Sequence, residues 1–529
     1  MSAPSNPRVG SIALAFAVAL CACSKGREEP RHVLLIVVDT LRADHLTPYG
    51  YEHDTSPRLA ELAEESVVFE WAISQASFTT PSMVSLHTGS YVAKEALTIP
   101  EDKATLAEAF QKGGYATGAF IYNDMLNAEN HFGRGYDYFE YKDPPYGTNE
   151  NILGWIGGNK DGNCFTYVHL NEAHDPYESK LTSRFSDARD GLDAERLAYF
   201  EEVRASMNLV DHEESLALID EEIGRYDDDV FYSDHRIGQI LDAVRETDLW
   251  DRTTVVVAAD HGEGLWTRLL FQRAGRYADQ PETLANWMQM THGAHAHAEI
   301  VHVPLILRSP DLPAGRVSSV VENIDVASTL LELCDLPAPT TLQGKSLVPL
   351  AQGVKPAEPL YAFSFTRFNT TVVTGGCMQL IEPTDLGRCS YGLETQLYDL
   401  KQDPRARRNI VSEHPDLVAE LQEVGRGRLE RGISTSQSAI GLETRLAINQ
   451  LGYLESGVVE SISSEMRVRS VDGLIEEIEN VHQSCLVRWE AAKALESRPL
   501  DKAQRQRLEA ARANERSPAV RDALEKSLG

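Results

Sequence analysis

Three runs of apolar, mostly branched residues most constrain how this chain of 529 residues can fold. They read "HVLLIVV" at 32–38, "CFTYVHL" at 164–170 and "TTVVVAA" at 253–259. A strand with one solvated face alternates polar and apolar residues, whereas these runs are apolar almost throughout. We therefore predict buried strands of a parallel sheet that is covered on both faces.

Helical segments alternate with these strands. The stretches 55–74 and 105–122 each read as a capped amphipathic helix followed by a short strand, and "VPLILRSP" at 303–310 reads as a further strand. Alternating strands and helices predict an α/β fold with a doubly wound, mostly parallel central sheet. With 42% hydrophobic residues, the chain can bury a large core.

The pattern changes twice toward the C-terminus. Short strands and turns followed by one helix predict a smaller α+β subdomain over 346–455, after a main domain over 31–345. Residues 456–529 read as a helical tail. Its segments 486–497 and 519–529 share a Val-Arg start and later apolar positions, so stacked repeats of the HEAT type and an ordinary amphipathic tail both fit.

The first 22 residues have the organisation of a bacterial export signal. A short basic region precedes an apolar run, which is too short for a membrane span and ends in "LCAC" at 20–23. This ending resembles a lipoprotein processing site and would leave Cys23 as a lipidated first residue; a plain signal cut near Ala22 is the alternative. We expect an exported protein in the periplasm or on the cell surface, anchored to the outer membrane by lipid.

The net charge is −30, from 50 basic and 80 acidic residues. Such a charge argues against nucleic acid as a partner and against electrostatic docking on anionic lipid. An anionic substrate would instead need a local attractor, such as a metal ion. Five cysteines follow the signal, without metal-ligand spacing, and Cys377 with Cys389 is the pair closest in sequence for a disulfide.

Polar residues stand where the buried strands end. Asp39 follows the first strand, His169 and His174 lie at the end of the second, and Asp260 with His261 follows the third. Ligands bind beyond the carboxyl ends of the strands in such sheets. Two carboxylates and an imidazole at one sheet edge predict a divalent-cation site.

The order and spacing of several stretches give a more specific indication. Five stretches resemble, in this order, those of the sulfatase family of the alkaline phosphatase superfamily. They are "VLLIVVDTLRADHLTPYGY", "QASFTTPSMVSLHTG", "VVVAADHGEG", "VHVPLILRSP" and "QLYDLKQDPRARRNIV". The resemblance covers about residues 31 to 455. It implies an alkaline phosphatase-like fold and a metal-dependent hydrolase of sulfate or phosphate esters.

The resemblance also implies roles for single residues. Asp39, Asp260, His261 and Thr79 match positions around the family's metal ion. His174 matches a histidine that contacts substrate oxygens or protonates the leaving group.

Three further positions follow from the same resemblance. His292 matches the residue that holds the anionic head of the substrate, and Asn123 matches a further polar contact. Arg42 and Asp325 match family positions as well, and we interpret both as structural.

Thr79 is an informative departure from the family pattern. Sulfatases need a Cys or Ser that is oxidised to formylglycine and an Arg four residues later, whereas this chain has Thr79 and Met83. Threonine is not a substrate for that oxidation. A metal-activated threonine could attack directly and form a covalent ester that water then cleaves, a step that is easier at phosphorus than at sulfur.

The metal is expected to be Mn²⁺ or Zn²⁺, with Ca²⁺ or Mg²⁺ as alternatives, because His261 offers imidazole nitrogen. A second metal is a further hypothesis. The eleven residues 292–302 contain four histidines: His292, His295, His297 and His302. Glu172 or His174 could supply a further ligand from another loop. The alternative is that His292 contacts substrate while the other histidines line a loop or helix.

Two other functions fit the sequence. The chain could be a non-catalytic lipoprotein that uses the fold as a binding or scaffold module, with the tail as its docking surface. It could also be an envelope transferase for phosphoethanolamine or phosphoglycerol. Catalysis is favoured over a non-catalytic role, because a site without a function would lose polar residues that reduce stability when they are buried and unpaired. The chain keeps five such residues: Asp39, Asp260, His261, His174 and His292.

Overall fold

The computed structural model describes residues 31–528 apart from internal gaps. The gaps are 92–95, 142–148, 178–182, 187–212, 266–291, 294, 367, 385–386, 389–392, 433–465, 481–484 and 516. The expected signal segment and Cys23 lie outside the described residues.

Among the described residues the larger sheet has nine strands in the order β4-β3-β5-β1-β6-β8-β2-β7, with β9 paired to β2. The strands are β1 His32–Val38, β2 Val67–Ile73, β3 Ala116–Ile121, β4 Tyr138–Tyr141, β5 Cys164–Leu170, β6 Thr253–Ala259, β7 His302–Val303, β8 Leu305–Arg308 and β9 Gly315–Glu322. The five strands from β4 to β6 run parallel, while β8 is antiparallel to both β6 and β2. The predicted mostly parallel sheet is confirmed.

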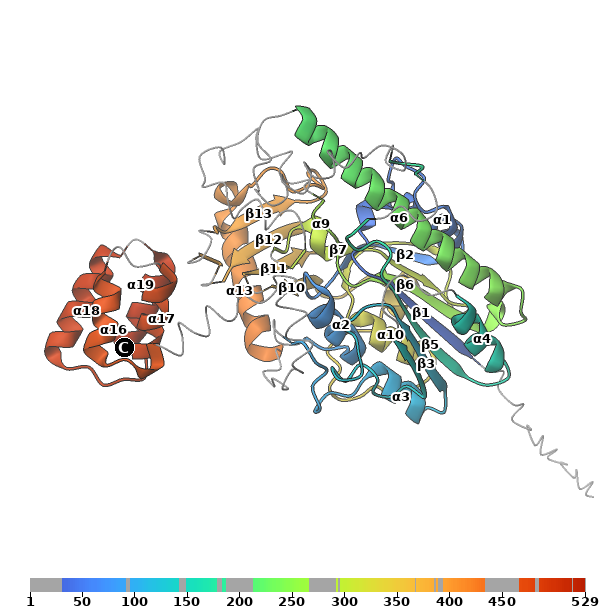
Figure 1. Cartoon of the computed structure of the whole chain (residues 1–529), viewed down its shortest axis with the longest axis horizontal. Helices are drawn as coiled ribbons and strands as arrows, with labels where there is room; N and C mark the ends of the chain where they lie inside the picture. Colours follow the sequence, from blue (N-terminus) through green and yellow to red (C-terminus); the bar gives the residue numbers. More distant parts are fainter. Residues whose placement is uncertain are drawn as a thin grey trace, which may run out of the picture.

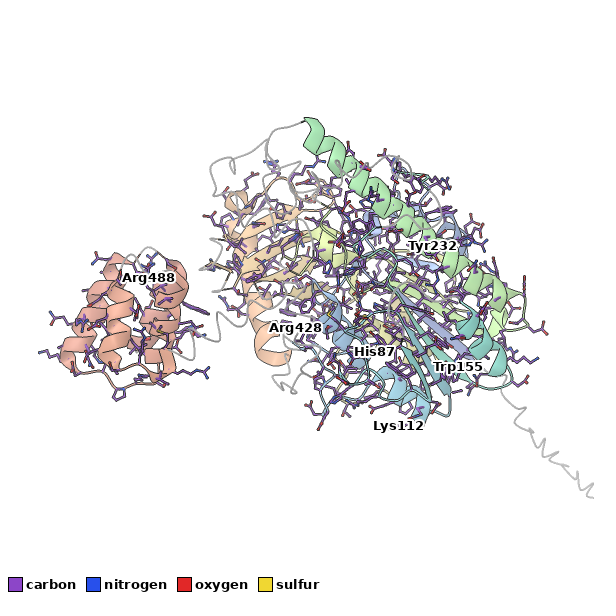
Figure 2. All side chains as sticks on the ribbon, in the orientation of Figure 1. His87, Lys112, Trp155, Tyr232, Arg428 and Arg488 are labelled. Carbon is purple, nitrogen blue, oxygen red and sulfur yellow. The ribbon has the colours of Figure 1, made fainter. Side chains whose placement is uncertain are left out.

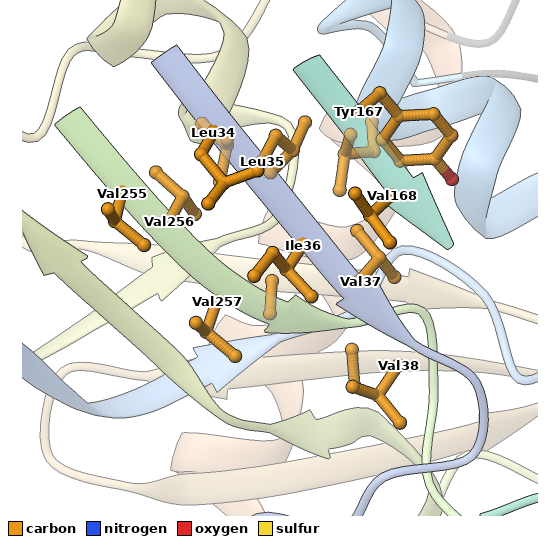
Figure 3. Close-up of a cluster of buried hydrophobic side chains, with 14 of the residues drawn as sticks. Leu34, Leu35, Ile36, Val37, Val38, Tyr167, Val168, Val255, Val256 and Val257 are labelled. Carbon is orange, nitrogen blue, oxygen red and sulfur yellow. The ribbon is translucent and has the colours of Figure 1, made fainter. Parts of the chain in front are cut away.

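The three apolar runs form the centre of this sheet. All seven residues of each of β1, β5 and β6 are buried. Figure 3 shows the branched side chains of β1 packed between those of its two neighbours. Removing this apolar surface from water is the main stabilisation that such a core provides.

Helices cover the sheet. They are α1 Pro57–Glu64, α2 Thr79–Thr88, α3 Leu106–Lys112, α4 Glu150–Gly158, α6 Glu213–Arg245, α9 Ala298–Val301, α10 Asp325–Leu333 and α11 Val348–Ala351, with 3₁₀ turns at Ala43–His45, Thr47–Tyr49 and Trp250–Arg252. One packed group contains α1, α4 and α6, and another contains α2, α3 and α10. Figure 1 shows the two groups on opposite faces, as a doubly wound fold requires. On the strand β3, Gly118 leaves room for the ring of Trp155 in α4, labelled in Figure 2.

A smaller antiparallel sheet follows the main domain. It consists of β10 Tyr361–Phe365, β11 Asn369–Thr374, β12 Met378–Pro383 and β13 Gln396–Asp399. The 3₁₀ turn Val411–Glu413 and helix α13 Pro415–Gly432 follow, and α13 contacts β11 and β12. The predicted C-terminal α+β unit is therefore present.

The tail is helical, as predicted. Its helices α16 Val471–Glu479, α17 Cys485–Leu495, α18 Lys502–Asn514 and α19 Pro518–Leu528 enclose an apolar core of their own. Their repeat type stays a prediction, as do the domain boundaries. Among the helices that the structure describes, none combines the length and apolarity needed to cross a membrane.

The expected pairing of Cys377 with Cys389 is wrong. Cys377 is a free, fully buried thiol, and Cys389 lies outside the described residues. Cys377 follows the end of β11 with a positive φ of 64°, and its side chain packs with Ile381 and Tyr398. This thiol contributes to an apolar cluster rather than to a crosslink.

Candidate metal centre and active site

The register of the three central strands brings the predicted metal residues together. Val38 of β1 lies opposite Leu170 of β5 and Ala259 of β6. Asp39 follows Val38 and Asp260 follows Ala259, and because β1 and β6 are adjacent parallel strands these two acids leave the sheet side by side. Both carboxylates are fully buried.

His261 completes this group. Its Nδ1 lies 2.9 Å from the Gly262 carbonyl oxygen, which can only accept, so Nδ1 carries the hydrogen. In the neutral ring Nε2 then presents a lone pair, and it lies 3.2 Å from Asp260 Oδ2 and 3.7 Å from Asp39 Oδ1. Burial, followed by the nearby His292, lowers the pKa of His261 to about 3, which keeps the ring neutral.

The geometry fits a cation. Asp39 Oδ1 and Asp260 Oδ2 accept no hydrogen bond from any residue in the described part of the chain. One ligand atom from each of Asp39, Asp260 and His261 lies within 4.8 Å of the others. Two buried carboxylate oxygens and an imidazole lone pair that converge without donors repel one another unless a positive ion lies between them.

Thr79 lies at the same point. It is the first residue of α2, whose cap residue Phe78 is extended, and it is fully buried. Its Oγ1 is 3.4 Å from Asp39 Oδ2 and 3.3 Å from His261 Nε2. The N-terminus of a helix favours negative charge, so an anionic group bound beside Thr79 would be stabilised there.

The neighbouring residues hold the two acids in place. The backbone N–H groups of Thr40 and His261 donate to Asp260 Oδ1 at 3.1 and 2.7 Å. Thr40 has a positive φ of 55°, a conformation that is strained for a β-branched residue. Its hydroxyl donates to the Ala173 carbonyl oxygen at 2.6 Å, so Thr40 offers the site its amide rather than a ligand oxygen.

Asn123 lies against Asp39. Its Nδ2 donates to Asp39 Oδ2 at 2.6 Å and to Asn171 Oδ1 at 3.1 Å. Asn123 therefore orients the Asp39 carboxylate, and its role as a substrate contact stays a prediction. His169 Nε2 lies 3.5 Å from the same Asp39 oxygen. Burial alone would raise the pKa of Asp39, but His169, His174 and His261 hold it below its ordinary value.

His292 and His174 face the same site. The His292 ring centroid lies 4.4 Å from that of His261 and 5.1 Å from that of His174. His174 Nδ1 donates to the Asp175 carbonyl oxygen at 2.7 Å, which leaves Nε2 of His174 as the nitrogen available to a ligand.

Glu263 is a site residue that the sequence reasoning missed. Its Oε2 lies 3.1 Å from His292 Nδ1, and both side chains are buried. Burial would lower the pKa of His292, yet Glu263 raises it above its ordinary value, and His292 in turn holds the pKa of Glu263 to about 2. The position of Glu263 two residues after His261 was the available signal, because residues of one tight loop share a site.

Other predicted residues lie elsewhere. Glu172 is a buried partner of Arg236, and it belongs to neither group of potential metal ligands in the described part of the chain. His302 Nε2 lies 2.8 Å from the Glu70 carbonyl oxygen, and the ring stacks on Trp71. Met83, which replaces the motif arginine, is fully buried in the core.

Arg42 and Asp325 have structural contacts. Arg42 donates to Asp44 and to the Glu263 carbonyl oxygen, and Asp325 accepts from the backbone N–H groups of Glu322 and Lys345. These contacts agree with the structural interpretation of both residues.

Comparison with known sequences gives weak but consistent likenesses. Arylsulfatase K of Danio rerio is 28% identical over 198 residues, covering 36% of this chain and 34% of that protein. The human arylsulfatase K is 26% identical over 204 residues, with the same coverage. The chain thus matches about a third of the length of these curated relatives.

Solved structures share the fold over most of both chains. A 2-O GAG sulfatase superposes with a TM-score of 0.58 at 18% identity and covers 76% of this chain and 92% of that chain. The phosphonate monoester hydrolase of Agrobacterium radiobacter has a TM-score of 0.55 at 17% identity and covers 75% and 96%.

Family models match in two parts. The model described as N-sulphoglucosamine sulphohydrolase, C-terminal, matches residues 294–430. The sulfatase model matches residues 31–336, which include the three central strands, α2 and both strand-end acids. The chain belongs to the sulfatase family.

Proposed function

We propose that this chain is a metal-dependent hydrolase of anionic esters, with Thr79 as nucleophile and a preference for phosphate over sulfate esters. One observation carries the proposal. The Thr79 hydroxyl lies within 3.4 Å of both Asp39 and His261, next to two buried carboxylate oxygens that lack hydrogen-bond donors among the described residues.

The charges in the site support a divalent metal. Asp39, Asp260 and Glu263 are three buried acids, and Glu263 raises the pKa of the neighbouring His292. An anionic ester would be repelled from such a site unless a dication balanced the two strand-end carboxylates. Asp39, Asp260, His261 and Thr79 would hold that ion.

When bound, the metal would lower the pKa of a coordinated hydroxyl and neutralise charge on the ester oxygens. The imidazole ligand favours Mn²⁺ or Zn²⁺ over Ca²⁺.

Thr79 would then act in two steps. Its oxygen forms a bond to phosphorus as the bond to the leaving alkoxide breaks, and the Thr79 proton passes toward Asp39 Oδ2, which already accepts from that hydroxyl. His174, acting as an imidazolium with a hydrogen on each ring nitrogen, gives its Nε2 proton to the leaving oxygen. In the second step water attacks phosphorus and passes a proton to the now neutral Nε2 of His174. The bond from phosphorus to the Thr79 oxygen breaks, and that oxygen takes its proton back from Asp39, which restores the hydroxyl and releases phosphate.

His292 would bind the anionic head. Its Nδ1 is engaged by Glu263 at 3.1 Å, so its Nε2 is the atom directed to a ligand. A histidine held positive by a buried carboxylate attracts an anion that the net charge of −30 would otherwise repel. Glu263 acts through His292 and is a positioning residue.

Thr79 and its neighbours support the phosphoester preference. Threonine does not form the aldehyde through which sulfatases release sulfate, and a covalent threonine ester is cleaved by water more readily at phosphorus. A phosphonate monoester hydrolase is among the solved structures that share this fold, alongside a 2-O GAG sulfatase. The exported, lipid-anchored location stays part of this proposal.

The non-catalytic alternative is disfavoured by the burial of the unpaired acids. A binding module that had no use for a metal would lose stability by keeping Asp39 and Asp260 fully buried beside each other. Substitutions to apolar or amide residues would relieve that cost.

The experiment measures turnover of matched aryl sulfate, aryl phosphate and bis-aryl phosphate substrates by metal-stripped protein after adding Mn²⁺, Zn²⁺ or Ca²⁺. Thr79→Ala should abolish turnover and leave metal binding largely intact. The matched control is Thr88→Ala at the other end of α2, where the hydroxyl donates only to the Val84 carbonyl oxygen at 2.7 Å. Full turnover by Thr79→Ala, or cleavage of the sulfate ester alone, would contradict the proposal.

A further inference from the structure

A second group of metal-ligating side chains lies just after His292. His295, His297 and Glu299 each offer one ligand atom, and these atoms lie within 4.8 Å of one another. Their exposed fractions are 3%, 9% and 9%. This group shares no residue with the group of Asp39, Asp260 and His261.

The local backbone explains the convergence. His297 is extended, with φ −74° and ψ 165°, and it forms the cap of α9. Side chains two residues apart in an extended segment project to the same side, which brings His295 and His297 together. Glu299 then lies in the first turn of α9 and returns toward its cap.

Hydrogen bonds define the tautomer of His297. Its Nε2 lies 2.7 Å from Gln396 Oε1, and the Tyr398 hydroxyl donates to the same oxygen at 3.0 Å. His297 Nε2 therefore carries the hydrogen, and the lone pair of the neutral ring is on Nδ1. That atom lies 3.0 Å from His295 Nδ1.

This arrangement is the one found around metal-bound imidazoles. A ligating histidine usually donates its other ring N–H to an oxygen acceptor, which orients the ring. Gln396 provides that acceptor from β13, 99 residues away in sequence. Two nitrogens on one Zn²⁺ at about 2.0–2.1 Å from the metal are separated by about 3.3 Å, so only a small adjustment is needed.

Glu299 completes the donor set and has a second neighbour. Its charge also acts on Arg42, whose guanidinium is already bonded to Asp44 and to the Glu263 carbonyl oxygen. A carboxylate has two oxygens, so Glu299 can face Arg42 and a cation together.

The group lies where the two sheets meet. The Ala296 carbonyl oxygen accepts from Thr371 Oγ1 at 3.1 Å and from Gln379 Nε2 at 2.9 Å, both in the smaller sheet. On the other side, the Gly262 N–H donates to the Ile300 carbonyl oxygen at 2.7 Å. Figure 1 shows α9 between the two sheets.

We propose that His295, His297 and Glu299 bind a second divalent transition metal, in the segment that follows His292 and contacts the smaller sheet through His297 and Gln396. Two imidazoles and one carboxylate form a donor set typical of Zn²⁺. The inference does not depend on the proposed function.

Zinc content per chain tests the inference. The full chain is stripped, reconstituted with Zn²⁺ and measured by elemental analysis. Wild type should hold two zinc ions per chain. The double variant Asp39→Asn/Asp260→Asn and the single variant His297→Gln should each hold one zinc ion. The variant that combines all three substitutions should hold none. The control His235→Gln changes an exposed histidine of α6 and should keep two.

Two results would overturn the inference: an unchanged zinc count in His297→Gln, or no zinc in Asp39→Asn/Asp260→Asn. If His297→Gln does not fold, Co²⁺ bound to Asp39→Asn/Asp260→Asn provides the answer by X-ray absorption. Two imidazole ligands on that cobalt support the site, whereas absence of bound cobalt contradicts it.

Discussion

Replacing Asp260 by Asn should change stability in opposite directions with and without metal. In the metal-free fold, Asp260 must carry either a buried charge next to Asp39 or a proton. Burial, followed by the Asp39 charge, raises the Asp260 pKa well above its ordinary value of 3.8. Asparagine has the same shape and is neutral at every pH.

The magnitude follows from proton linkage. A folded-state pKa above the unfolded value means that stability is complete at low pH and is lost as the pH rises toward the folded pKa. Each pH unit is equivalent to about 1.4 kcal/mol, so keeping Asp260 protonated at pH 7 costs up to about 4 kcal/mol. We expect Asp260→Asn to stabilise the chelated protein at pH 7, by no more than this upper limit, and to have little effect at pH 4.

Metal reverses the sign. A ligand present at 1,000 times its Kd stabilises the folded state by about 4.1 kcal/mol, which exceeds the gain of the variant in the metal-free protein, and the variant loses a charged oxygen ligand for that ion. The assay is urea unfolding of both proteins between pH 4 and pH 8, with chelator or with Zn²⁺. Asp228→Asn is the control. Asp228 Oδ1 accepts from the Arg184 and Phe185 N–H groups and Oδ2 accepts from the Ser186 N–H, so an amide nitrogen in place of one oxygen loses an acceptor and should destabilise under both conditions.

The reasoning would be refuted if Asp260→Asn destabilised the chelated protein as much as the zinc-loaded one. That result would mean that protein donors, rather than a cation, satisfy the two acids. A pH-independent difference between the two proteins in chelator would equally contradict the assigned origin of the effect.

Three further predictions follow from individual contacts. Glu263→Gln should lower the pKa of His292, because the neighbouring carboxylate charge is removed. KM for an anionic ester should then rise with pH more steeply than in wild type, while kcat changes less. Measuring KM from pH 5 to 9 checks this expectation. Gly262→Ala would place a Cβ 2.1 Å from the Glu299 carbonyl oxygen, and it should lower the free energy of unfolding by about 2–4 kcal/mol, measured by thermal unfolding. The control is Gly315→Ala, whose Cβ would have no atom within 4 Å and which should leave the free energy of unfolding unchanged. Burial and the neighbouring Asp325 raise the pKa of Glu322 to about 8, so its protonated form stabilises the fold below about pH 4.5 and this stability is lost as the pH rises through 8. Glu322→Gln should therefore gain stability relative to wild type between pH 5 and pH 9, and an unchanged difference across that range would contradict the assignment.

Part of the site could be predicted because it depends on strand register alone. Strands 32–38 and 253–259 are recognisable from apolar residues, and parallel strands of equal length end at one edge. Asp39 and Asp260 follow those ends directly, so their proximity is a consequence of local pattern.

The remaining contacts depended on the tertiary structure. Glu172 pairs with Arg236 in α6, Asn123 turns onto Asp39, and Gln396 reaches His297 from another sheet. No periodicity links such residues, because each contact depends on side-chain direction and on how separate layers pack. The sequence alone therefore determined the central strands and the acids at their ends. Only the packing of distant segments decided which polar side chains orient those acids and where the second histidine group lies.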